Sequence, residues 1–156
     1  QHAFMTNRDG DTPALSAVTG LILETFRLNG ALIASGDALV APIGLTSARW
    51  QVLGAIDAAS GPLPVAHIAR NMGLSRQGVQ RLANEMEKDG LLAFTPNPHH
   101  KRAPLAVMTA KGRETFRAAM ALQRQWAAAL ARDIPPQELR AASALMNTLR
   151  SRLEDE

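Results

Sequence analysis

The feature that most constrains this chain is the stretch from residue 65 to residue 90, VAHIARNMGLSRQGVQRLANEMEKDG. Apolar residues recur every three or four positions on both sides of one break, which predicts two helices joined by a very short turn. Gly73 suits the left-handed end of the first helix, Ser75 is a strong N-cap for the second, and Gly90 ends it. The residues expected to face inward are Val65, Ile68, Ala69 and Met72, then Val79, Leu82 and Met86. Two helices so closely joined indicate a helix-turn-helix.

The segment after this pair changes from helical to strand-like periodicity. LLAFT (91–95) and PLAVMT (104–109) are short β-compatible runs, and between them lies PNPHHKR (96–102), with two prolines, two histidines and a Lys-Arg pair. We expect a β-hairpin with this cationic loop at its tip. The prolines stiffen the loop, so less entropy would be lost when it docks onto a partner. A helix-turn-helix followed by a hairpin predicts a winged helix.

Helical segments flank this unit on both sides. Residues 13 to about 35 repeat apolar side chains at helical spacing. A loop, GDALVAPIG (36–44), and a helix capped by Thr46 are expected next, and then SGPLP (60–64) breaks the chain. After the hairpin, Thr109 caps a long helix, IPP (134–136) ends it, and a last helix follows. We therefore predict a mainly α fold with a small β-hairpin wing.

Composition excludes several classes of protein. Hydrophobic residues make up 46% of the chain and charged residues 20%, which is typical of a globular protein with a core. There is no cysteine, which excludes disulfides, thiolate metal sites and cysteine redox chemistry. The first residues have no signal-peptide pattern, and no apolar run approaches the roughly 18 residues of a membrane span. We expect a cytoplasmic protein without a membrane partner.

Positive charge is concentrated in the middle of the chain. The formal net charge is +3, but residues 46–117 contain ten Lys or Arg against five Asp or Glu. A basic centre between faintly acidic ends is typical of a protein whose centre binds a polyanion. Chance clustering on a solvated surface explains the same counts, so charge alone does not decide.

The outward face of the second helix of the pair carries polar and cationic side chains. They are Arg76, Gln77, Gln80, Arg81 and Asn84, all of which can donate hydrogen bonds, and none of which is acidic. In a helix-turn-helix this helix enters the major groove, where arginine pairs with guanine and glutamine or asparagine with adenine. Ser75 and the helix N-terminus can hold a phosphate. Gly78 either lets the backbone approach DNA or is a local weakness.

The tip of the hairpin would lie beside that helix. Lys101 and Arg102 have the charge and reach to enter the neighbouring minor groove, which attracts arginine where it is narrow. His100 adds positive charge in mildly acidic solution. Taken alone, such a loop is an ordinary solvated turn, but its place after a helix-turn-helix favours DNA binding.

Three motifs together resemble the MarR family of bacterial transcriptional regulators. They are LTSARWQVL (45–53), HIARNMGLSRQGVQRLANEMEKDGLL (67–92) and NPHHKRAPLAVMTAKG (97–112), within a resemblance that extends from about Pro13 to Glu154. It implies that residues 75–89 form the recognition helix and that Arg102 is the wing arginine. The family commonly has Asp where His100 stands and an acidic residue where Asn97 stands. The tip is therefore more positive here, and Arg102 less braced.

The resemblance also implies a homodimer in which the first helix and the last two pack against the partner's copies. The apolar stripes of these helices agree, because the winged helix offers little surface for both ends of the chain. We expect an N-terminal dimerisation helix (13–40), a winged helix-turn-helix region (45–110) and C-terminal dimerisation helices (111–156). A two-fold dimer would bind double-stranded DNA at a pseudo-palindromic site with half-sites about 10 base pairs apart.

Members of the family often hold a small aromatic or phenolic acid between the dimerising and DNA-binding lobes. The corresponding candidates here are Phe26, Arg27, Trp50 and Phe116, although each also suits an ordinary core or surface position. Such a ligand would release a repressor from DNA by favouring a different spacing of the two wings. Lacking cysteine, the chain cannot act as a thiol-oxidation sensor.

Two other functions compete with this interpretation. An enzyme would depend on His67, His99, His100 and scattered carboxylates, which lack the spacing of a zinc site, so we expect no enzyme, metal or cofactor. A winged helix used only for protein contacts would not need a recognition face that is polar, cationic and free of acid. The salt dependence of binding to random DNA distinguishes the three, because only phosphate contacts give a steep slope.

Overall fold

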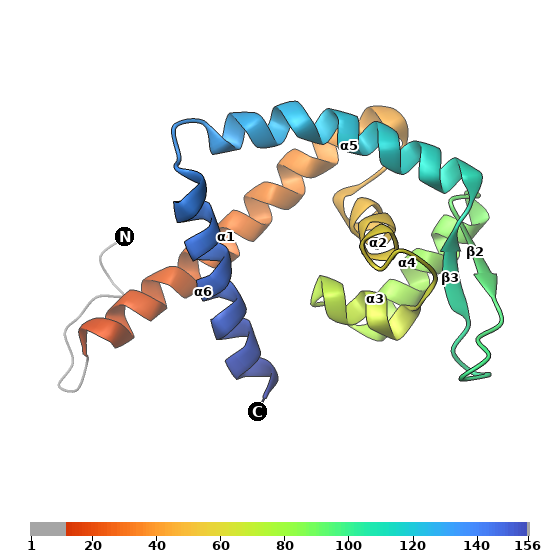
Figure 1. Ribbon diagram of the computed structural model, residues 1–156, viewed down its shortest axis with the longest axis horizontal. Helices are drawn as coiled ribbons and strands as arrows, with labels where there is room; N and C mark the ends of the chain where they lie inside the picture. The colour runs from red at the N-terminus through yellow and green to blue at the C-terminus, as the bar shows by residue number, and fades with distance from the viewer. Residues whose placement is uncertain (1–11, 156) are drawn as a thin grey trace. The chain divides into compact units, whose positions relative to one another are not determined.

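A computed structural model describes residues 12–155 of the chain (Figure 1). Residues 1–11, where no signal-peptide pattern was found, and residue 156 lie outside the described residues. The elements are α1 (Pro13–Val40), η1 (Ala41–Ile43), α2 (Ser47–Ala58), β1 (Leu63–Pro64), α3 (Val65–Met72), α4 (Arg76–Lys88), β2 (Leu92–Thr95), β3 (Leu105–Met108), α5 (Ala110–Ala131) and α6 (Pro136–Glu154). The chain divides into two compact units, one ending at Phe116 and one beginning at Arg117.

The helix-turn-helix forms as predicted from α3 and α4. Gly73 ends α3 with a φ of 65°, and the Oγ of Ser75 caps α4 by accepting a hydrogen bond of 3.1 Å from the Gly78 N–H. Val79 and Met86 are fully buried, but the third buried residue of α4 is Ala83, whereas Leu82 is only half-buried. Two of the three expected positions are thus confirmed, and Ala83 takes the place of Leu82 in the buried stripe.

The wing is larger than predicted, because it is a sheet of three strands in the order β1-β3-β2. β2 and β3 form the expected antiparallel hairpin, with Leu92 opposite Met108. The stretch 60–64 was expected only to break the chain, yet Leu63 pairs with Ala106 and Pro64 with Leu105. Two residues are too few to show strand alternation, and proline is tolerated there because β1 is an edge strand.

α1 extends further than the sequence indicated. The loop expected from Gly36 is helical as far as Val40, and a 3-10 turn with Gly44 at a φ of 77° follows. Glycine weakens a helix, but a Cβ at Gly36 would lie 2.5 Å from the Oγ of Ser47. Gly36 is buried because α1 and α2 approach each other closely at this point.

The junction between α1 and α2 is held by polar contacts. The Ser47 N–H donates to Oδ1 of Asp37 at 2.7 Å, and the Ser47 Oγ donates to the carbonyl of Ile33 at 2.9 Å. Asp37 therefore accepts from the Ser47 N–H, one of the N–H groups at the start of α2 that have no partner within the helix. The helix dipole favours a negative charge at this end. The predicted N-cap, Thr46, accepts from the Arg49 N–H at 3.2 Å.

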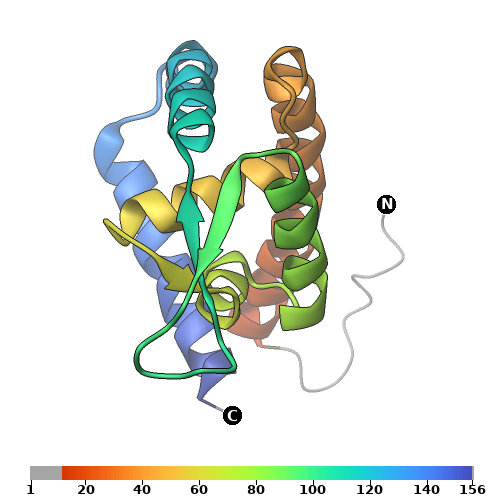
Figure 2. The same cartoon turned by 90° about the vertical axis from the view of Figure 1, so that its right-hand side faces the viewer.

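The core of the first unit lies between α2, α3, α4 and the sheet. Its largest fully buried side chains are Leu53, Ile68, Met86 and Leu92, and each comes from a different element. Figure 2 shows the sheet in front of the helices, with the hairpin extending past them to its tip. The core thus fixes α4 and the wing on one scaffold.

Among residues 12–155, one helix is long and apolar enough to cross a membrane by length and composition. It covers Pro13–Ile43 and has a hydropathy of 1.3, so the expectation that no apolar run approaches such a length was too strong. A single helix of this kind is weak support for a membrane span. Arg27 and Glu24 form an ion pair of 3.1 Å in the middle of α1, and both side chains are exposed.

Candidate nucleic-acid interface

The predicted recognition residues share one face of α4. Arg76, Gln77, Arg81 and Asn84 are exposed, and Gln80 is half-buried. Glu85 and Lys88 line the same open surface and were not among the predicted residues. This face is therefore not free of acid, contrary to expectation. The helical spacing could have revealed Glu85, which follows Arg81 by four residues.

The loop between β2 and β3 is braced by Asn97. Its Nδ2 donates to the carbonyl of Ala103 at 3.0 Å, and its Oδ1 accepts from the His99 N–H at 3.0 Å. An amide can make both bonds, whereas a carboxylate could only accept, so Asn97 closes the loop in a way that an acidic residue could not.

The cationic tip itself is open. His100, Lys101 and Arg102 are exposed. Among the described residues, the guanidinium of Arg102 has neither an ion pair nor a hydrogen bond. The Arg102 guanidinium is therefore available to bind an anion from outside the chain. No intramolecular partner orders this side chain beforehand.

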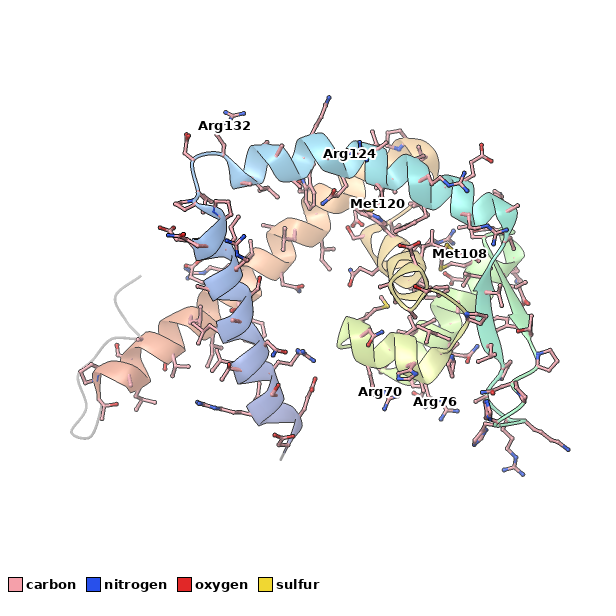
Figure 3. The ribbon with its side chains drawn as sticks, in the orientation of Figure 1. Arg70, Arg76, Met108, Met120, Arg124 and Arg132 are labelled. Atoms are coloured by element: carbon pink, nitrogen blue, oxygen red, sulfur yellow. The ribbon has the colours of Figure 1, made fainter. Side chains whose placement is uncertain are left out.

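The beginning of α4 and the wing tip lie at the same end of the first unit in both views (Figures 1 and 2). Arg70, in the last turn of α3, and Arg76, at the start of α4, both extend toward that end (Figure 3). Arg70 is exposed and was not predicted as a site residue. The feature of the sequence that could have indicated Arg70 is a cationic residue in α3, the helix that precedes α4.

The far end of α4 is fixed by bonds from two other helices. Arg49 of α2 forms an ion pair of 2.7 Å with Asp89, and the Lys111 Nζ of α5 donates to the Asp89 carbonyl at 2.8 Å. Thr109 caps α5 as predicted and also donates to the carbonyl of Gly90 at 2.6 Å. These bonds connect α2, α4 and the first turn of α5.

Gly112 explains why threonine and glycine occur together where α5 begins. The Gly112 N–H donates to Oγ1 of Thr109 at 3.0 Å. A Cβ at Gly112 would collide with the carbonyl oxygen of Leu91, which follows α4. Only glycine lets the first turn of α5 pack this closely against the start of the wing.

The four candidate ligand residues are not brought together in the described chain. Phe116 lies over α2, where a Cβ at Gly54 would be 3.8 Å from its ring. Trp50 is half-buried one turn earlier on α2 and on the same face as Gly54. Phe26 is 71% exposed, and Arg27 pairs with Glu24. Both lie on α1 well before its junction with α2.

The histidines that an enzyme or metal site would need are dispersed. His67 is exposed on α3, while His99 and His100 are neighbours in the wing loop. Within residues 12–155, no three His, Asp or Glu side chains are grouped so as to hold a metal ion.

Comparison with known proteins gives the same assignment. Residues 43–103 match the family model described as MarR family. An uncharacterised protein of Mycobacterium tuberculosis is 40% identical over 101 residues, which cover 65% of this chain and 69% of that protein. The transcriptional activatory protein BadR of Rhodopseudomonas palustris is 32% identical over 98 residues, covering 62% of this chain and 56% of BadR.

Solved structures share the fold. A MarR family transcriptional regulator from Streptomyces coelicolor has a TM-score of 0.71 and 29% identity, over 93% of this chain and 98% of that one. M. tuberculosis MosR, solved in complex with DNA, has a TM-score of 0.69 and 23% identity, over 83% and 96%. The organohalide-sensing regulator RdhR, solved with 2,4-dichlorophenol bound, has a TM-score of 0.74 and 18% identity, over 97% and 89%. The last two likenesses concern the fold alone.

A winged helix with an open cationic face on its second helix, together with these relatives, defines a DNA-binding transcriptional regulator rather than an enzyme. The chain belongs to the MarR family.

Proposed function

We propose that two copies of this chain bind a pseudo-palindromic site in double-stranded DNA, with α4 in the major groove and the wing tip in the adjacent minor groove. The observation that carries the proposal is that the first turn of α4 and the wing tip lie at one end of the same unit. Both surfaces are polar, cationic and exposed. We place this activity in the cytoplasm, where a regulator of bacterial genes binds its DNA.

Each part of the surface has a role that follows from its chemistry. Four residues of α4 would touch base edges, because the N-terminal part of a recognition helix reads the bases: Arg76, Gln77, Gln80 and Arg81. Ser75 can donate its hydroxyl hydrogen to a phosphate while its oxygen caps α4. Lys101 and Arg102 would occupy the minor groove, with His100 beside them.

Arg70 joins this surface as a phosphate contact. The first helix of a helix-turn-helix crosses the DNA backbone, and Arg70 extends from the last turn of α3 toward the same end as Arg76 (Figure 3). Its guanidinium has no hydrogen bond or ion pair to another described residue. Arginine is well suited to phosphate because its planar fork donates two parallel hydrogen bonds.

Dimerisation is supported by apolar side chains that the single chain leaves exposed. On α1 they include Leu15, Ile22, Leu28 and Leu32, and on α6 they are Leu139, Leu145, Met146 and Leu153. Large apolar surfaces of this kind usually mark a protein interface. Packing against the same helices of a second copy would bury them and set the distance between two recognition helices.

Repression relieved by a small aromatic or phenolic ligand is the regulation we propose. Two observations support it: RdhR was solved with 2,4-dichlorophenol, and Trp50 and Phe116 lie beside one face of α2. Phe26 and Arg27 would complete a ligand site only if the assembled dimer brings them close. BadR is named an activator, so a reporter assay must decide the direction of regulation.

Binding to random DNA at increasing salt tests the proposal directly. A dimer that contacts 6–10 phosphates should lose about 10³ to 10⁵ in affinity between 50 and 200 mM salt. Selection from a random DNA pool would then show whether the preferred site is an inverted repeat. A protein that binds only other proteins would show neither the slope nor a preferred sequence.

A further inference from the structure

Two amide side chains on the outward face of α4 are bonded to each other. The Gln80 Nε2 donates to Oδ1 of Asn84 at 2.9 Å. The two residues are four positions apart, so their side chains are neighbours along the helix surface. Gln80 is also the more enclosed of the pair, since it is half-buried while Asn84 is exposed.

The bond leaves the two amides with different capacities for reading a base. An amide has one oxygen acceptor and two N–H donors. Gln80 uses one N–H and keeps Oε1 and the other N–H, which are the acceptor and donor that adenine N6 and N7 require. The oxygen of Asn84 already accepts this bond, so a base would have to share it, whereas the Gln80 Oε1 accepts no bond from a described residue.

The positions of Gln80 and Asn84 along α4 also favour Gln80 as the residue that contacts a base. Gln80 is four residues after Arg76, about 6 Å along the axis, whereas Asn84 is about 12 Å along it. Base contacts come mainly from the N-terminal part of a recognition helix. Asn84 lies beside Glu85, whose carboxylate lines the same surface and is repelled by phosphates.

We propose that Asn84 is a positioning residue and that Gln80 is the adenine-reading residue of α4. Asn84 holds the Gln80 amide in place before DNA arrives, which reduces the entropy that Gln80 loses on binding. This inference rests on the proposed function, because it requires α4 to lie in the major groove.

Selection from a random DNA pool with four proteins tests the proposal: the natural chain, Gln80→Ala, Asn84→Ala and the double variant. Gln80→Ala should lose the preference for adenine at one position of each half-site by about 5- to 150-fold. Asn84→Ala should weaken the same preference by about 2- to 10-fold, which is the effect of one hydrogen bond. The double variant should match Gln80→Ala, since Asn84 acts only through Gln80.

A matched variant distinguishes the positioning of Gln80 by Asn84 from the space that the Asn84 side chain fills. Asn84→Asp keeps an acceptor oxygen for Gln80, so it should preserve the adenine preference while weakening binding to all sequences through charge repulsion. Replacing the preferred base with 7-deazaadenine, which lacks N7, should weaken the natural chain but not Gln80→Ala.

Two results would overturn the proposal, and they differ from a failure of the proposed function. If Asn84→Ala changes the preference at another base position, or if the two effects add in the double variant, Asn84 reads DNA by itself. If Gln80→Ala, Gln77→Ala and Arg81→Ala all leave every base preference intact, α4 does not read the major groove, and the proposed function fails with the inference.

Discussion

Arg49 and Asp89 form an ion pair of 2.7 Å that joins the first turn of α2 to the residue following α4. Asp89 also accepts a hydrogen bond from Lys111 through its carbonyl, so α2, α4 and α5 meet at one residue. α4 is thereby fixed at the end opposite to its proposed base contacts.

Removal of the Asp89 carboxylate should destabilise the fold slightly. Asp89→Ala should lower the free energy of unfolding by about 0.2–1 kcal/mol, because the Asp89 side chain is 54% exposed and solvent screens the pair. Urea unfolding measures the change. Glu87→Ala, an exposed acidic residue of α4, is the control and should have a smaller effect. A loss well above 1 kcal/mol would indicate that the pair acts as more than a surface ion pair.

Two glycines in α1 should respond in opposite ways to the same change. Gly36→Ala places a Cβ 2.5 Å from the Ser47 Oγ and should cost about 1–3 kcal/mol, as overpacking does. Gly20→Ala meets nothing within 4 Å and should be neutral or stabilise the helix by up to about 1 kcal/mol. Thermal unfolding of both variants checks the contrast. Equal effects would show that the junction between α1 and α2 tolerates a side chain.

Arg70→Ala should change the salt dependence of DNA binding without altering base preference. The loss of one phosphate contact per protomer should reduce the slope of log K against log salt by about 0.9 for each copy. Arg132→Ala, directly after α5, is the control with the same change in charge (Figure 3). An unchanged slope for Arg70→Ala would exclude the phosphate contact.

Gln77→Ala and Arg81→Ala should each cost about 1–3 kcal/mol on the preferred DNA site and little on random DNA. Arg102→Ala should weaken binding with a smaller loss of base discrimination, unless its groove is specific for A/T. Fluorescence anisotropy on both DNAs separates these effects. Equal losses on every sequence for the two α4 variants would contradict base reading by α4.

Local signals were sufficient for the helix-turn-helix. Four residues act at helix ends through hydrogen bonds to residues within four positions: Gly73, Ser75, Thr46 and Thr109. Their roles can therefore be predicted from the sequence alone. The same reasoning named the five residues on the outward face of α4. It did not name Arg70, because the sequence of α3 alone does not show that this residue extends toward the same end as Arg76.

Contacts between distant segments decided the rest. The sequence predicted a loop from Gly36, but the chain is helical there, and the close approach of Gly36 to Ser47 explains why this helix needs glycine. β1 forms only because β3 lies beside it. The sequence by itself determined the order of the helices, the caps at Thr46, Ser75 and Thr109, and which helix carries the cations. Only the tertiary structure decided the third strand, the length of α1 and the common end shared by α4 and the wing tip, because each depends on atoms that are far apart in the chain.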